Sequence, residues 1–409
     1  MQLPQLQKPE SQHTQSHHAR VYIVAAKRSA IGAFGGSIAA LSPRAIGAPI
    51  AKAVISSVGN GFEVDEVIVG NVLGAGHGMN IARQVAIDAG IPASTPAFVV
   101  NRVCGSGLQA VMLAAQSIQA GVNQVVLAGG VESMSQAAFA SLGTRWGVRM
   151  GSSELRDLMV SDGLTDAFSL LHMGITAENI AERMQISRAD QDLFAAESQQ
   201  KAERALARGD FTQEIIGLPI MERGKQIGEF LVDEFVRKGV TAEALAKLKA
   251  AFKKDGCVTA ANSSGINDGA AFLLVVSESA LKKYNLTPLV EIVGYACAGV
   301  EPEVMGLGPV EAVKKLEKIT GIACADFERV EANEAFAAQA LGVQRALGLD
   351  AAKINPSGGA IALGHPIGAS GARVLVTLLH GLIRDNQRSG LATLCVGGGQ
   401  GVALAIVRC

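Results

Sequence analysis

The chain has 409 residues, of which 49% are apolar and 18% charged, and its formal net charge is -1. This length exceeds the size at which one core keeps growing, so we expect two or three domain-sized units. The near-neutral charge excludes a basic footprint for nucleic acid and a polybasic membrane signal, and no apolar run is long enough to span a bilayer. Partners must therefore be inferred from individual sites, and we expect part of the buried surface to lie between subunits.

Six cysteines are spread along the chain without CxxC spacing, at Cys104, Cys257, Cys297, Cys324, Cys395 and Cys409. This pattern argues against a disulfide framework and against a zinc site, so we expect no metal and a reducing compartment. Residues 1–19 are polar and lack the apolar segment of a secretory signal. We interpret them as a disordered extension, and we expect the protein in a bacterial-type cytoplasm.

Taken in chain order, the expected strands and glycine turns occur twice, which indicates an internal duplication. The matching segments share their apolar pattern and their order: 21–24 with 290–293, 65–70 with 328–333, the helix opening at Ser106-Gly107 with the helix opening at Ser370-Gly371, 125–130 with 391–398, and 270–276 with 402–406.

The two halves differ at one hairpin. In the second half, strands 391–396 and 402–406 are joined by a short glycine turn, whereas the corresponding first-half strands, about 125–127 and 270–276, are separated by most of 131–269. We therefore expect an inserted domain. It carries an amphipathic helix over 191–208, for which Ser187 and Asp190 form an N-terminal cap.

Strands that alternate with long helical patterns predict an α/β fold, here two similar layered halves packed together. The expected division is a first half of residues 20–136 and 265–288, an inserted loop domain of residues 137–264, and a second half of residues 289–409. The turns that bear Cys104 and His365 are expected to meet across a pseudo-two-fold axis.

Cys104 lies where an expected strand ends, small residues turn the chain, and an apolar helix begins. Unpaired backbone N–H groups and the helix dipole at such a position favour the thiolate, so Cys104 is a candidate nucleophile. Far downstream, glycines frame His365 in Gly364-His365-Pro366-Ile367-Gly368 and Cys395 in Cys395-Val396-Gly397-Gly398-Gly399-Gln400-Gly401. One nucleophile, one base and one further thiol indicate covalent catalysis.

These residues resemble the thiolase family, and the resemblance covers nearly the whole chain from about Arg20 onward. The segments that carry it are those around Cys104, His365 and Cys395, together with Asn333-Glu334-Ala335-Phe336. Their joint order and spacing make chance agreement improbable. The resemblance implies the thiolase-like duplicated fold, layered α-β-α-β-α with an inserted loop domain, and assembly into a homotetramer or homodimer.

The resemblance also implies a role for each site residue. Cys104 takes the acetyl group from a first acetyl-CoA, and His365 is the base that activates its thiol. Cys395 removes an α-proton from a second acetyl-CoA, and the carbanion attacks the Cys104 thioester. His365 with a water held by Asn333 would form one oxyanion hole, and the backbone N–H groups of Cys104 and Gly397 the other. Asn333 could instead only cap the following helix.

No Walker-type loop and no GxGxxG after a strand is evident, so coenzyme A must bind through scattered contacts on the inserted domain. By resemblance, Ser264, Ala260 and Phe252 line the path of the pantetheine arm. Arg237 would lie at the nucleotide end, although it could also be an ordinary surface arginine. Seven residues later the family often has a serine where this chain has Ala244, so one hydrogen bond to the nucleotide is in doubt.

His172 and Met173, in Leu171-His172-Met173-Gly174, resemble the version found in biosynthetic, short-chain members, where their bulk leaves little room for a long acyl tail. The resemblance therefore implies an acetyl-CoA C-acetyltransferase that acts on acetyl-CoA, acetoacetyl-CoA and CoA without a separate cofactor. A broad-range degradative 3-ketoacyl-CoA thiolase is one alternative, and a catalytically silent acyl-CoA or lipid-binding protein on the same scaffold is another. Ketoacyl synthases fit less well, because they use a histidine or asparagine where this chain has Cys395.

Overall fold

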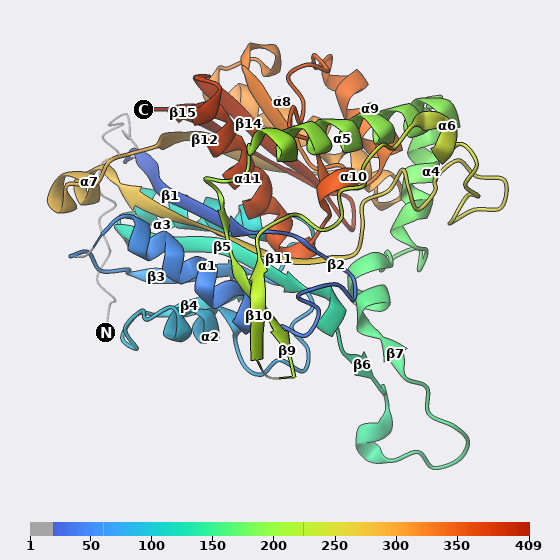
Figure 1. The fold of residues 1–409 in the computed structure, drawn as a ribbon, viewed down its shortest axis with the longest axis horizontal. Helices are drawn as coiled ribbons and strands as arrows, with labels where there is room; N and C mark the ends of the chain where they lie inside the picture. The colour runs from blue at the N-terminus through green and yellow to red at the C-terminus, as the bar shows by residue number, and fades with distance from the viewer. Residues whose placement is uncertain (1–18, 60, 224) are drawn as a thin grey trace, which may run out of the picture.

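The computed structural model describes residues 19–59, 61–223 and 225–409 (Figure 1). The expected extension, residues 1–19, lies outside the described residues except for Ala19. The first half contains β1 (Val21–Ser29), β2 (Gly32–Ala33), α1 (Pro43–Ser57), β3 (Glu66–Gly70), α2 (Ile81–Asp88), β4 (Ala97–Val100), α3 (Ser106–Gln119), β5 (Val125–Ser133), β11 (Asn267–Ser277) and α7 (Glu278–Tyr284). The second half contains β12 (Val290–Gly299), α8 (Gly308–Thr320), β13 (Arg329–Ala332), α9 (Ala337–Leu347), α10 (Ala360–Leu363), α11 (Ile367–Arg384), β14 (Ser389–Val396) and β15 (Gln400–Arg408).

The strand order of the main sheet, β13-β14-β15-β12-β1-β11-β5-β3-β4, makes the duplication visible. In the first half β3 runs parallel to β5, while β5 and β11 and then β11 and β1 pair antiparallel. In the second half β13, β14, β15 and β12 repeat this pattern in the same order. The halves join where β1 pairs antiparallel with β12 over only three residue pairs, beginning with Val21 opposite Ile292.

The elements form five layers, as the resemblance implies (Figure 1). The helices α3 and α11 pack against each other in the middle, α1 and α2 cover the outer face of the first half, and α8 covers the outer face of the second. Along β5, Val126 and Ala128 face the central helices while Val125 and Leu127 face α1. Burial on both faces explains why this strand is a continuous apolar run.

The insertion leaves the first half after β5 and returns at β11. It contains β6 (Phe139–Ala140), β7 (Arg156–Asp157), a π-helical turn (Met159–Leu164), α4 (Met173–Arg183), α5 (Arg188–Arg208), β8 (Ile215–Ile216), β9 (Leu218–Glu222), β10 (Lys225–Phe230) and α6 (Ala242–Leu245). The expected helix begins three residues earlier than predicted, and Ser187 and Asp190 form the expected capping box. A long arm that carries β6 and β7 projects from the body (Figure 1).

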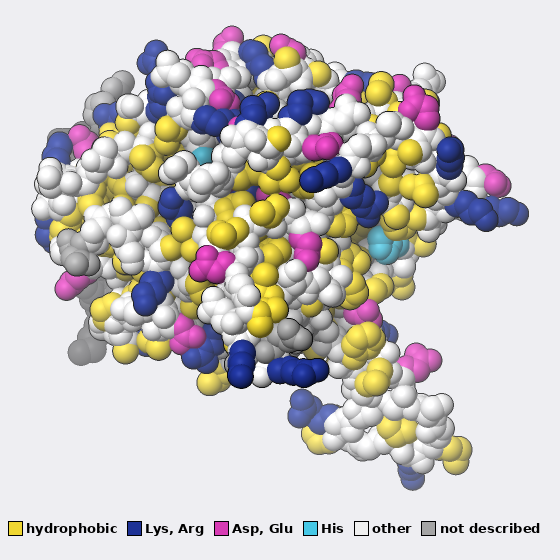
Figure 2. Space-filling view, in the orientation of Figure 1, with side chains coloured by type: hydrophobic (Ala, Val, Ile, Leu, Met, Phe, Trp, Pro, Cys, Tyr) yellow, Lys and Arg dark blue, Asp and Glu magenta, His cyan; other side chains and the backbone are white. Residues whose placement is uncertain are grey.

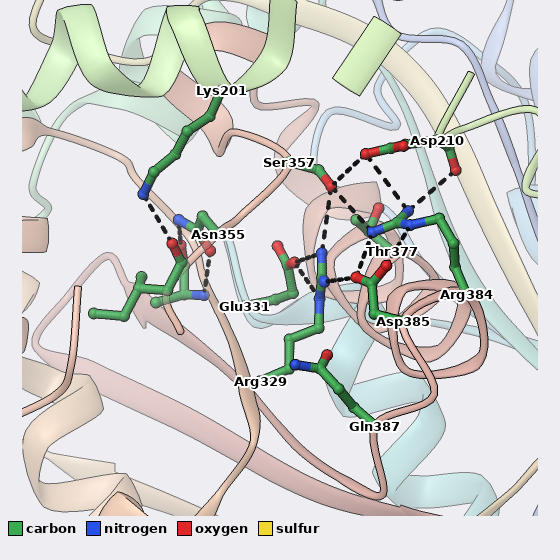
Figure 3. A network of polar contacts seen from close by, with 12 residues as sticks. Lys201, Asp210, Arg329, Glu331, Asn355, Ser357, Thr377, Arg384, Asp385 and Gln387 are labelled. Carbon is green, nitrogen blue, oxygen red and sulfur yellow. Dashed lines mark hydrogen bonds and ion pairs between the residues drawn. The ribbon is translucent and has the colours of Figure 1, made fainter. Parts of the chain in front are cut away.

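Polar contacts fasten α5 and the loop after it to the second half (Figure 3). The Lys201 ammonium donates to the Ile354 carbonyl over 3.1 Å. Beyond α5, Asp210 approaches Ser357 and Arg384, and the same group of residues includes the buried ion pair of Arg329 with Glu331. Among the described residues, no helix is long and apolar enough to cross a membrane.

Candidate active site

Cys104 lies in the loop between β4 and α3, two residues before the helix begins. The preceding Val103 has a φ of +44°, which is a strained conformation for a β-branched residue. The loop is held by Ser106, whose hydroxyl accepts from the Arg102 N–H over 2.8 Å and donates to the Val103 carbonyl over 2.6 Å. These bonds fix the direction in which the thiol points.

Burial opposes the effect of the helix start on the Cys104 thiol. Burial raises the pKa of the Cys104 thiol to about 11, although hydrogen bonds from the backbone N–H groups of Gly397 and of Cys104 itself act in the opposite direction. The helix-terminal effect is outweighed because a charged sulfur loses solvation inside an apolar cavity. Cys104 therefore needs a base to give up its proton.

His365 supplies a neutral imidazole at the same cavity. It lies between α10 and α11, where its backbone N–H donates to the Asn267 side chain over 2.9 Å and its Nδ1 shares a hydrogen bond with the Ser370 hydroxyl. Its Nε2 is buried without a hydrogen-bond partner. Burial, and then the charge of Arg373, lower the pKa of His365 to about 3, so the ring is uncharged at neutral pH and Nε2 can accept a proton.

Cys395 lies near the end of β14, fully buried, close enough to Cys104 that the charge of one thiol affects the other. Burial raises the pKa of Cys395 far above the usual range. After β14 come Gly397, Gly398 and Gly399, of which the last two have positive φ, a conformation that favours glycine. This turn points the Gly397 N–H toward the Cys104 sulfur.

Asn333 follows β13, and neither polar atom of its buried side chain has a hydrogen-bond partner. The next helix, α9, takes Phe336 as its N-cap residue, so Asn333 does not cap it. The structure therefore excludes the capping alternative. Both polar atoms of this buried amide thus remain available for a hydrogen bond.

A cavity of about 340 Å³ joins most of these groups. It is lined by Cys104, His365 and Gly397, and by all six residues predicted to bind substrate, namely His172, Met173, Arg237, Phe252, Ala260 and Ser264. Asn333 and Cys395 are not part of the lining surface. Cys395 packs in the same apolar cluster as Met173 and Phe252, and both Asn333 and Cys395 are almost fully buried.

Aromatic contacts shape the part of the cavity toward the insertion. The His172 ring stacks on Phe252 with centroids 4.7 Å apart, and Phe252 meets the edge of Phe336 at 6.1 Å. Gly174 makes this packing possible, since a Cβ there would lie 2.2 Å from the Phe252 ring. The exposed Arg237 lies over the Phe235 ring at 5.2 Å on the rim, so it is oriented by the cavity wall.

Several lining residues were not predicted from the sequence: Met134, Gly163, Leu164, Phe235, Met305, Phe336 and Ile367. Two carried a usable signal, because Phe336 ends the Asn333 segment and Ile367 ends the glycine-framed His365 segment. The π-helical turn that presents Gly163 and Leu164 is a form found frequently at functional sites, but its sequence does not reveal it.

The chain belongs to the thiolase family: the family model described as "Thiolase, N-terminal domain" matches residues 21–279, and the one described as "Thiolase, C-terminal domain" matches residues 286–408. It is 54% identical to an acetyl-CoA acetyltransferase of Chromobacterium violaceum over 95% of this chain and 99% of that protein. A relative in Pseudomonas aeruginosa with the same name is 53% identical over the same shares. The predicted family is thus confirmed.

Solved structures agree. A crystal structure of the Bacillus anthracis acetyl-CoA acetyltransferase superimposes with a TM-score of 0.94 at 44% identity, covering 96% of this chain and 100% of that one. A crystal structure of human mitochondrial 3-ketoacyl-CoA thiolase gives 0.92 at 43% identity, covering 96% and 99%. These likenesses confirm the predicted thiolase fold.

Proposed function

We propose that this protein is an acetyl-CoA C-acetyltransferase, which reversibly condenses two molecules of acetyl-CoA into acetoacetyl-CoA and CoA. The observation that carries the proposal is one cavity at which the thiol of Cys104, the unpaired Nε2 of a neutral His365 and the N–H of Gly397 come together, with a second thiol beneath them. The relatives named acetyl-CoA acetyltransferase support it.

In the first half-reaction, the Cys104 thiol gives its proton to His365, and the sulfur attacks the carbonyl carbon of acetyl-CoA. The C–S bond to coenzyme A breaks, and Cys395 donates its proton to the departing sulfur. The product is an acetyl thioester on Cys104, with a Cys395 thiolate beside a protonated His365. Burial, which raises the pKa of Cys395, makes this thiolate a strong base.

In the second half-reaction, the Cys395 thiolate removes an α-proton from the second acetyl-CoA. The carbanion forms a C–C bond with the thioester carbonyl, and Cys104 leaves as a thiolate that recovers its proton from His365. Each group thus regains its starting protonation state: the Cys104 proton returns from His365, and the α-proton of the second acetyl-CoA replaces the proton that Cys395 gave to coenzyme A. The proposed steps use only side chains of the chain. Coenzyme A enters as part of the substrate and leaves as product.

Both half-reactions place negative charge on a thioester oxygen. We assign one oxyanion site to His365 and to a water held by Asn333, whose unpaired amide supports this role. The other uses the backbone N–H groups of Cys104 and Gly397. A preorganised donor of this kind contributes roughly 3 to 4 kcal/mol to the transition state.

The coenzyme A arm is proposed to pass Phe252, Ala260 and Ser264, which share the cavity wall, toward Arg237 at the rim. We propose residues 137–264 as the inserted loop domain that recognises coenzyme A. The halves, residues 20–136 with 265–288 and residues 289–409, supply the chemistry. Ala244 stands where the family often has a serine, so we also infer that one hydrogen bond to the nucleotide is absent there.

The short-chain assignment rests on His172 and Met173, which narrow the cavity beside Phe252. The similar fold of human mitochondrial 3-ketoacyl-CoA thiolase keeps a broad-range degradative enzyme as the second candidate. Cleavage rates for C4 and C10 3-ketoacyl-CoA decide between them. We expect faster cleavage of the C4 substrate, and faster cleavage of C10 would overturn the assignment.

A catalytically silent acyl-CoA or lipid-binding protein is tested separately. A short incubation with labelled acetyl-CoA is expected to label Cys104, as read by peptide mass spectrometry. No label on Cys104 in a folded sample would favour the binding-only alternative.

We also propose a homotetramer or homodimer in the cytoplasm. The projecting arm carries apolar side chains on its surface (Figure 2). Trp146 and Met150, which lie between β6 and β7 of this arm, are 90% and 95% exposed. Exposed apolar surface of this kind supports contact with another subunit. Six free thiols support a reducing compartment. Light scattering of the wild type should give two or four times the chain mass, and a monomer would contradict the assembly.

A further inference from the structure

Glu132 is a buried carboxylate that none of the roles above uses. It lies near the end of β5 and has no exposed surface. Its Oε1 accepts from the Asn71 amide over 2.8 Å and the Leu73 N–H over 3.0 Å, and its Oε2 accepts from the Val72 N–H over 3.1 Å and the Gly368 N–H over 2.8 Å. All four partners are donors, so this arrangement fits the carboxylate anion and not the acid.

These bonds connect the two halves of the molecule. Residues 71–73 follow β3 of the first half, whereas Gly368 is the second residue of α11 and stands three positions after His365. Gly368 must be small here, because a Cβ would lie 2.6 Å from the Glu132 Oε2 and 2.9 Å from the Asn71 Cα. The carboxylate thus fixes the start of the helix that follows the base.

The same bonds hold the cavity wall from behind. Glu132 accepts from the backbone N–H groups of Leu73 and of Gly368, which follows Ile367. The side chains of Leu73 and Ile367 pack with Met134 against Cys104. Met134 itself follows Glu132 by two residues. Glu132 is therefore linked to each segment that supports this apolar wall.

We propose that Glu132 is a positioning residue: it fastens the loop of His365 to the first half, and its carboxylate places a negative charge behind the wall that packs against Cys104. The proposal deepens the function proposed above and rests on it for its meaning in acetyl transfer. The charge of Glu132 adds to the larger effect of burial in raising the pKa of Cys104. The thiol therefore stays protonated until His365 accepts its proton.

Other ionisable groups lie around Glu132 and Cys104: His365, Cys395, His172 and Arg237 at or beneath the cavity, Asp268 of β11 near Glu132, and Arg373 of α11 near His365. Among these groups, Glu132 is the one whose charge contributes to the raised pKa of Cys104. Burial raises the pKa of Glu132 itself to about 7, and the backbone N–H groups of Leu73, Gly368 and Val72 oppose that shift.

The test separates charge from position with two variants, Glu132→Gln and Glu132→Asp. Alkylation of Cys104 by iodoacetamide is followed by peptide mass spectrometry, without any acyl-CoA. At about pH 8, Glu132→Gln should react about threefold faster than wild type, the effect of lowering a thiol pKa by about half a unit. Glu132→Asp keeps the charge, so its alkylation rate should stay within about twofold of wild type.

Both variants should slow acetyl transfer at least about tenfold in kcat, because neither side chain can make all four hydrogen bonds. Glu331→Gln is the control for lost stability, since it removes a buried charge paired with Arg329 and should leave Cys104 alkylation unchanged. A wild-type alkylation rate in Glu132→Gln would overturn the role of the charge. Equal acceleration in Glu132→Asp would overturn it too, because access would then be the cause.

The outcome does not depend on the proposed activity. Alkylation reports on Glu132 even when wild type transfers no acetyl group, so a failure of the function and a failure of this inference are distinguishable. If Glu132→Gln does not fold, Glu132→Asp decides the positioning role. A wild-type kcat in that variant would overturn it.

Discussion

Gly107 of α3 lies against the backbone of α11, and Gly371 of α11 lies against the backbone of α3. A Cβ on Gly107 would lie 2.7 Å from the Ala372 nitrogen, and a Cβ on Gly371 would lie 2.3 Å from the Leu108 nitrogen. Backbone atoms in packed helices cannot move aside, so both positions exclude any side chain. This reciprocal contact lets the two helix starts approach, and it brings Cys104 and His365 to one cavity.

Gly371→Ala should therefore separate α3 from α11. We expect a loss of about 1–3 kcal/mol in the free energy of unfolding, the usual range for overpacking, and a larger loss of acetyl transfer than this destabilisation explains. Urea unfolding and kcat measure the two effects. Gly228→Ala is the control, because a Cβ there meets only the Ile220 side chain at 3.9 Å. Wild-type kcat in Gly371→Ala would contradict the argument.

Cys395→Ala should still become acetylated on Cys104, although more slowly because it lacks the acid for the departing sulfur, and its condensation of two acetyl groups should be far more impaired. Removing a general acid-base group lowers rates by about 10²- to 10⁴-fold, and we expect that range for acetoacetyl-CoA formation. Intact-protein mass spectrometry detects the acetyl thioester, and Cys104→Ser is the control that should not form it. Condensation by Cys395→Ala at the wild-type rate would show that another group removes the α-proton.

His365 should make the protein acid-sensitive. Its pKa is about 3 in the folded protein against 6.5 ordinarily, so between these values the unfolded chain binds a proton that the folded protein does not. The free energy of unfolding therefore rises with pH in this window. The stability that the neutral His365 contributes is lost as the pH falls toward 3. In His365→Asn, the slope between about pH 4 and 6 should be smaller by up to about 1.4 kcal/mol per pH unit. Urea titrations at several pH values measure it, and equal slopes would show that His365 is not buried in its neutral form.

Asp233→Ala should be strongly destabilising. Its carboxylate accepts from both terminal nitrogens of the fully buried Arg28, over 2.7 and 2.9 Å, and from the Ile31 N–H over 2.8 Å. Its loss would leave Glu214 as the remaining anionic partner of Arg28, so we expect a cost near the lower end of the roughly 3–5 kcal/mol of unfolding free energy for breaking a buried pair. The exposed pair of Arg44 with Asp88 is the control, and Asp88→Ala should cost less than about 1 kcal/mol. Similar losses at both sites in urea unfolding would refute the distinction.

Phe252→Ala should weaken substrate binding more than chemistry. It removes the stack on His172 and the edge contact with Phe336, so the KM for acetyl-CoA should rise about tenfold, equivalent to about 1.4 kcal/mol. Initial-rate kinetics separate KM from kcat. Phe62→Ala removes an edge contact with Tyr284 outside the cavity and should leave KM unchanged. A fall in kcat alone would place Phe252 in the chemical steps instead.

The sequence predicts the duplicated strand order because each half repeats the same apolar runs and turns. It underestimates β5, which was expected to end near Leu127 and continues to Ser133. Gly129 and Gly130 suggest a turn, but here they permit close packing, since a Cβ on either would lie 2.2 Å from a carbonyl oxygen of a neighbouring element. A glycine in one sequence does not distinguish these two uses.

The candidate site shows the same division between what motifs predict and what packing decides. Cys104 and His365 stand out by their glycine frames. The protonation state of Cys104 cannot be predicted from the motif, because desolvation by the surrounding wall reverses the effect on its pKa that is expected at a helix start. The wall residues Met134 and Met305 are ordinary apolar residues in the sequence, and only the folded chain places them at the cavity.

The two equivalent hairpins of the duplicated sheet differ in what connects their strands: Gly397, Gly398 and Gly399 between β14 and β15, and residues 134–266 between β5 and β11. The entropy lost on closing a loop grows only with the logarithm of its length, and the strand pairing stays the same in both cases. The connection between β5 and β11 can thus change in length and sequence, while the equivalent connection between β14 and β15 remains a short turn beside Cys395. Such an arrangement lets the segment between β5 and β11 vary without changing the turn that follows Cys395.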